Sequence, residues 1–100
     1  MSSLNRRRGK DLERFIAKDL GGRRVGILGQ EDVILHRGIS IECKERQRLP
    51  VFIYNCMAQA ERNADGDTAM VVLHECGADH GKDIVMMRYA EFKAILEAVK

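Results

Sequence analysis

The spacing of apolar residues along the chain predicts helices alternating with strands. In the segment RRRGKDLERFIAKDLGG, residues 6–22, apolar residues recur at helical spacing: Leu12, Phe15, Ile16 and Leu20. Gly21-Gly22 ends this helix in the way a left-handed cap requires. RRVGI, 23–27, predicts a short strand ending near Gly29. EDVILHRGISIECKE, 31–45, predicts two strands joined by a tight turn that contains Gly38.

The second half of the chain predicts a helix, two strands and a last helix. RLPVFIYNCMAQAERNADGD, 48–67, is the helix, with Pro50 in its first turn and ADGD as its stop. TAMVVLHEC, 68–76, is almost wholly apolar and predicts a strand covered on both faces. IVMMR and YAEFKAILEAVK follow as a strand and a helix. Other apolar side chains of this half are interpreted as core: Phe52, Tyr54, Met57, Met70, Met86 and Met87. The order αβββαββα indicates an α/β fold in which a mixed β-sheet is flanked by helices.

Length and composition indicate one soluble domain over residues 1–100. The chain is 45% hydrophobic and 32% charged, with no apolar run long enough to cross a bilayer and no secretory signal, so we expect a cytoplasmic protein.

Its three cysteines lack CxxC spacing, which favours reduced thiols over disulfides. A zinc site from Cys76 and His74 has too few ligands in tight pairs to be favoured. Lys and Arg outnumber Asp and Glu in residues 1–50 but not in residues 51–100. A basic N-terminal half is typical of a protein that binds a phosphate backbone.

The turn length sets the expected register of the hairpin. A two-residue turn would place Val33 opposite Glu42, an apolar residue against a charge. A three-residue turn, 36–38, with Gly38 in the left-handed conformation, places Val33 opposite Ile41 and Asp32 opposite Glu42. One face is then entirely aliphatic. The other carries two carboxylates, with Lys44 two residues beyond.

Two interpretations of this charged face are open on the residues alone. Like charges directly opposite one another are destabilising, and a divalent cation bound by Asp32, Glu42 and the backbone carbonyl of Cys43 would offset the repulsion. Lys44 could then orient an attacking water and stabilise charge on a phosphate. Alternatively, Lys44 is paired with a carboxylate on a solvated strand end, an interaction worth under about 1 kcal/mol.

These residues resemble the PD-(D/E)XK nuclease superfamily, and more closely the archaeal-type and phage Holliday junction resolvases. The resemblance rests on RGKDLER in the first helix, on EDV, and on IECK after a hairpin. It implies a restriction-endonuclease-like fold with Asp32 and Glu42 as metal ligands, Lys44 as the catalytic lysine, and Glu13 as a further acid at the metal or its water shell. Mg²⁺ is the implied cofactor, with Mn²⁺ able to substitute. Glu31 stands where the family has proline, and strand alternation assigns the ligand to Asp32.

The expected function is therefore metal-dependent cleavage of branched DNA, with the four-way junction as substrate. Two matched nicks require two sites, which a two-fold homodimer supplies; no membrane or small-molecule cofactor is implied. The predicted DNA contacts are Arg6, Arg7, Arg8, Lys10, Arg46 and Arg48, and Gln59 is a predicted supporting residue of the active site. A nicking or flap nuclease with the same chemistry is one alternative, and a non-catalytic nucleic-acid-binding module is another. For His36 we expect a solvent or phosphate contact, and for His74 and His80 no chemistry.

Overall fold

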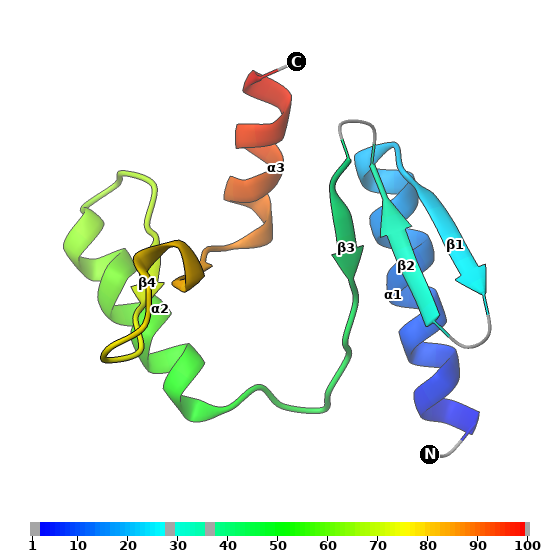
Figure 1. Ribbon diagram of the computed structural model, residues 1–100, viewed down its shortest axis with the longest axis horizontal. Coiled ribbons are helices and arrows are strands. Elements are labelled where there is room, and N and C mark those ends of the chain that lie inside the picture. Colours follow the sequence, from blue (N-terminus) through cyan, green and yellow to red (C-terminus); the bar gives the residue numbers. More distant parts are fainter. Residues whose placement is uncertain (1–2, 28–29, 36–37, 100) are drawn as a thin grey trace. The chain divides into compact units, whose positions relative to one another are not determined.

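The fold is known from a computed structural model, which describes the backbone of residues 3–27, 30–35 and 38–99 and the side chains of residues 9–25, 33–35 and 38–99 (Figure 1). The elements follow one another as α1-β1-β2-β3-α2-β4-η1-β5-α3. The predicted αβββαββα order is confirmed, with one short 3₁₀ helix, η1, added. Residues cluster into two compact units, Met1–Gln47 and Arg48–Lys100, hereafter unit 1 and unit 2. The single domain over residues 1–100 stays a prediction.

Unit 1 is a helix packed on a three-stranded antiparallel sheet. Helix α1 spans Ser3–Leu20, so it begins three residues before the predicted segment. The sheet has the order β1-β2-β3, formed by Arg23–Ile27, Gln30–Ile34 and Ser40–Glu42. Figure 1 shows α1 alongside β1 and β2, the two strands that it contacts.

The C-terminus of α1 has the predicted glycine cap. Gly21 has φ 72°, a left-handed conformation that costs glycine little. The Gly22 amide donates to the Ala17 carbonyl at 2.8 Å, which satisfies one of the last helical carbonyls. A Cβ on Gly22 would lie 2.6 Å from Leu35 Cδ2 and 2.8 Å from the Ile34 carbonyl oxygen. Only glycine therefore lets the chain turn this close to β2.

The buried face of α1 differs from the predicted stripe. Ile16 and Ala17 are buried against the sheet, as is the side chain of Glu13 one turn earlier. Phe15, which was predicted to belong to the stripe, is 57% exposed. It lies one position away from the row 13-16-17-20, which has the i, i+3, i+4, i+7 spacing of one helix face.

Unit 2 contains the remaining elements. Helix α2 spans Val51–Ala64 and packs on β4, Val71–Leu73, which pairs antiparallel with β5, Ile84–Met86. Helix η1, His80–Lys82, lies between these strands in sequence, and α3, Tyr89–Ala98, closes the chain. All three ladders of the described strands are antiparallel, so a mixed sheet stays a prediction. None of the described helices is both long and apolar enough to cross a bilayer.

The apolar segments of unit 2 are less covered than predicted. Met57 is buried, as expected, but Phe52 is 59% exposed and Tyr54 47% exposed. One face of α2 turns toward β4, and the run VFIY is longer than one face can bury. Val72 is 61% exposed and Met70 54% exposed, so the predicted coverage of this strand on both faces is wrong within unit 2.

A bidentate ion pair joins α2 to the residue that precedes α3. Arg88 donates from Nη2 to Glu61 Oε1 at 2.9 Å and from Nε to Oε2 at 3.1 Å. These hydrogen bonds lower the pKa of Glu61, and the same pair raises the pKa of Arg88. The fork geometry of the guanidinium matches the two oxygens of the carboxylate, which is why both hydrogen bonds form at once.

Candidate active site

The β2–β3 hairpin has the predicted register. The Cα partners are Asp32 with Glu42, Val33 with Ile41, and Ile34 with Ser40. The Leu35 amide donates to the Ile39 carbonyl at 2.8 Å, and Gly38 has φ 73°. The two carboxylate residues, at 32 and 42, are therefore directly opposite one another in the ladder. The predicted register is confirmed, whereas the assignment of these residues to a metal site stays a prediction.

The two faces of the hairpin also separate as expected. Val33 is fully buried, and its partner Ile41 is half-buried, on the side that packs toward α1. Glu42 and Lys44 are exposed on the other side, with half-buried Cys43 between them. The ladder ends at Glu42, so the alternation of exposure continues beyond the last paired residue. This alternation is what presents Glu42 and Lys44 together to solvent.

Glu42 and Lys44 form an ion pair. Lys44 Nζ lies 3.2 Å from Glu42 Oε1. The side chain of Lys44 is 77% exposed and that of Glu42 is 65% exposed. An exposed pair of this kind contributes little to stability because water screens it. Both side chains can therefore change partners at low cost. The same geometry is what a solvated strand end would show.

Glu13 lies on the opposite face of the sheet from this pair. Its carboxylate accepts a hydrogen bond from Arg24 Nη2 at 3.3 Å, and Glu13 is only 7% exposed. Arg24 is the Cα partner of Val33, so it shares the face that α1 covers. The contact with Arg24 was not expected from the sequence. The position of Glu13 in the buried row of α1 was the available signal, because a buried carboxylate requires a partner.

The predicted DNA contacts fall into two groups. Lys10, Arg46 and Arg48 have exposed side chains that can reach a phosphate. The second group lies outside the described side chains and consists of Arg6, Arg7 and Arg8. The side chain of the predicted metal ligand Asp32 and the whole of His36 also lie outside the described residues. The assignments to these residues stay predictions.

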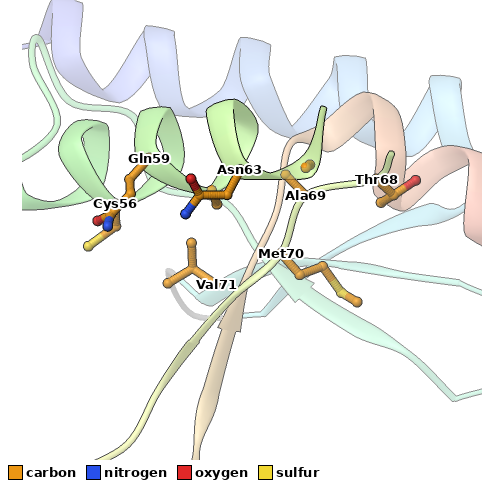
Figure 2. A pocket seen from close by; sticks show the side chains of 9 residues that line it. Cys56, Gln59, Asn63, Thr68, Ala69, Met70 and Val71 are labelled. Atoms are coloured by element: carbon orange, nitrogen blue, oxygen red, sulfur yellow. The ribbon is translucent and has the colours of Figure 1, made fainter. Parts of the chain in front are cut away.

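Gln59 lies in unit 2, on a hollow of about 450 Å³ between α2 and the segment leading into β4. Figure 2 shows Cys56, Gln59 and Asn63 projecting from α2 toward Val71. The lining of this hollow contains amide, hydroxyl, thiol and apolar side chains and no charged ones. Its polar groups can donate and accept hydrogen bonds but cannot replace the carboxylates that a divalent cation prefers. A role for Gln59 beside Lys44 stays a prediction.

The hairpin brings together residue types that hard cations bind in proteins. Register places carboxylate residues at 32 and 42 opposite one another, and Cβ atoms so paired are about 4.5–5.5 Å apart. Mg²⁺ and Mn²⁺ prefer carboxylate oxygens, and Lys44 supplies a neighbouring positive charge. Comparisons with protein-family models, with curated protein sequences and with solved structures find no match to this chain.

Proposed function

We propose that this protein is a metal-dependent, structure-specific DNA endonuclease of the PD-(D/E)XK type that cleaves four-way junctions. The observation that supports the proposal is the backbone pairing of Asp32 with Glu42, together with the exposed ion pair of Glu42 and Lys44. The proposal includes the restriction-endonuclease-like fold.

In this function Asp32, Glu42 and the carbonyl of Cys43 would hold Mg²⁺. The ion would polarise the phosphate and lower the pKa of the attacking water. Lys44 has a separate task. Its ammonium, which lies 3.2 Å from Glu42 Oε1 in the structure, would stabilise the negative charge that develops on the phosphate.

The other residues would position DNA. Lys10, Arg46 and Arg48 would bind phosphates as point charges or forks, a mode that holds a backbone without reading its sequence. Junction resolution needs two nicks in opposed strands, and one chain offers one such site, so the active form would be a two-fold homodimer. Glu13 is buried on the helix side and bonded to Arg24, so it would support the site by holding α1 on β1 rather than by reaching the metal or its water shell.

The test is cleavage of a labelled four-way junction by the purified chain in Mg²⁺, Mn²⁺, Ca²⁺ or EDTA. Glu42→Ala should abolish Mg²⁺-dependent cleavage, and Lys44→Met should reduce it by about 100-fold or more. Glu45→Ala and Lys18→Met are the matched controls, since both residues are exposed and neither belongs to the site. Full activity of Glu42→Ala, with an unchanged circular dichroism spectrum, would disprove the assignment.

The substrate is tested separately from the chemistry. Flap, nicked duplex, linear duplex and single-stranded DNA are compared with the junction at equal concentration, and the mass of the protein in solution is measured alongside. Preference for the junction by a dimer supports resolution. Preference for a flap or a nicked duplex by a monomer supports the same chemistry on another substrate.

The exposed Glu42–Lys44 pair favours one second candidate, a non-catalytic nucleic-acid-binding module. The two candidates differ in how they respond to metal. For the nuclease, Mg²⁺ or Mn²⁺ should raise the melting temperature, and Asp32→Asn should remove this rise. In the absence of metal, Asp32→Asn should stabilise the fold by about 0.2–1 kcal/mol, because it removes one of two opposed charges. The binding module shares this register and hence the second effect, but it predicts no change of melting temperature with Mg²⁺ or Mn²⁺.

A further inference from the structure

A second group of side chains with metal-binding chemistry lies in unit 2, at the end of β4. His74 follows the last residue of β4, His80 begins η1, and Asp83 directly follows η1. His74 Nδ1 lies 2.6 Å from Asp83 Oδ1, and His80 Nδ1 lies 3.1 Å from Asp83 Oδ2. The two imidazole rings stack with centroids 4.4 Å apart and an interplanar angle of 28°. One carboxylate thus bridges two neighbouring histidines.

The backbone explains why these three side chains meet. Leu73 and Ile84 are partners in the β4–β5 ladder, so the next residues outward, His74 and Asp83, face each other at its end. The η1 turn then brings the third side chain back, with the Asp83 amide donating to the His80 carbonyl at 3.0 Å. Secondary structure therefore preorganises all three groups before any ligand is present.

The donor atoms are close enough to share one metal ion. One ligand atom from each residue lies within 4.8 Å of the others, and this is the one such group among the described side chains. In a zinc site the metal–nitrogen and metal–oxygen bonds are about 2.0–2.2 Å, so neighbouring donors are about 3.0–3.5 Å apart. The two Nδ1–oxygen distances, 2.6 and 3.1 Å, are already near that spacing. To bind the metal, each neutral imidazole would present the lone pair of Nδ1 and carry its ring proton on Nε2.

We propose that His74, His80 and Asp83 bind a borderline transition-metal ion, for which Zn²⁺ is the probe. Two imidazole nitrogens and one carboxylate oxygen favour Zn²⁺ and its neighbours over Mg²⁺ and Ca²⁺, which prefer oxygen alone. This set differs from the all-oxygen ligands of the hairpin, so the proposal does not depend on the nuclease assignment. The bound ion fastens η1 to the end of β4.

Exposure indicates how the site is built. The side chain of Asp83 is 13% exposed and that of His74 35%, whereas that of His80 is 86% exposed. Asp83 and His74 thus form the inner side of the site, and His80 lies on its solvent side. Three protein ligands leave at least one position of the metal open. Cys76 is exposed and is not a member of the group, so its thiol is not needed.

The experiment is a calorimetric titration of the metal-free full chain with ZnCl₂ and, separately, MgCl₂, with thermal melts of the same samples. We expect one Zn²⁺ per chain with a raised melting temperature, and no change with Mg²⁺ in the Glu42→Ala background, which lacks the hairpin site. His80→Ala should weaken Zn²⁺ binding by about tenfold or more, and Asp83→Asn should weaken it similarly. Because the His80 side chain is 86% exposed, we expect the His80→Ala chain to fold as the unaltered protein does.

The matched controls are His36→Ala, which removes the remaining histidine of the chain, and Cys76→Ser. Both should bind Zn²⁺ as the unaltered protein does. Equal affinity of His80→Ala and the unaltered chain would overturn the proposal, as would loss of binding in Cys76→Ser alone. Absence of Zn²⁺ binding in the unaltered chain would reduce the group to a hydrogen-bonded clamp.

Discussion

Replacement of Gly22 by alanine tests how closely the end of α1 approaches β2. The new Cβ would lie 2.8 Å from the Ile34 carbonyl oxygen and 2.6 Å from Leu35 Cδ2. The leucine methyl can move by a rotamer change, but the carbonyl oxygen belongs to the strand. Relief of the clash therefore requires a backbone shift in β2, which also carries Asp32.

The expected cost follows from this geometry. An ordinary contact between the added carbon and an oxygen is about 3.4 Å, so the backbones must separate by roughly half an ångström, and such overpacking costs about 1–3 kcal/mol. A loss of about 2 kcal/mol in a chain of this size lowers the melting temperature by roughly 8–16 °C. We expect Gly22→Ala to fold with this loss of stability.

Gly9→Ala is the matched control. Gly9 lies within α1, and a Cβ there meets nothing within 4 Å. Alanine should stabilise the helix by about 1 kcal/mol, because glycine is the less favourable helix former. Both variants are measured by thermal and urea unfolding followed by circular dichroism. Unchanged melting of Gly22→Ala, with Gly9→Ala raised as expected, would refute the close approach to β2.

Two further predictions concern ion pairs. Glu13→Gln should lower the free energy of unfolding by about 1–3 kcal/mol, because Arg24 loses a buried carboxylate partner. Urea unfolding measures this loss, and an unchanged midpoint would contradict the buried pair. Arg88→Gln should destabilise the chain at neutral pH and progressively less in acid, because Arg88 lowers the pKa of Glu61. That contribution is fully present above the ordinary pKa of a glutamate and is lost as the pH falls through the lowered value. Melting curves of both proteins from pH 7 to pH 3 measure the difference, and a difference that grows in acid would contradict the sign.

The hairpin could be predicted because few registers satisfy its sequence. Alternating residues leave a small set of pairings, and the turn with Gly38 permits the one that buries Val33 against Ile41. The glycine cap after α1 was predictable for a similar reason, since a left-handed φ at Gly21 selects one residue type. Local chemistry settles both features without knowledge of distant contacts.

Other features depend on contacts between distant segments and were not predicted. Glu13 meets Arg24 because α1 lies on β1, and the helix pattern alone does not name that partner. The exposure of Phe52 depends on how much of α2 the short strand β4 covers. For His74 and Asp83, both strands were predicted, but the long connection between them leaves the register of the ladder undetermined by sequence.

The turn between Leu35 and Ile39 fixes which side of β3 faces solvent. Three residues, 36–38, separate the two positions that close the ladder. A slip of β3 by one residue against β2 would exchange its faces, so that Glu42 would point toward α1 and Cys43 toward solvent. A slip of two residues would restore the sides, but Glu42 would no longer lie opposite position 32. A change in the turn that shifts the register can therefore hide the charged groups while leaving each of them in the sequence.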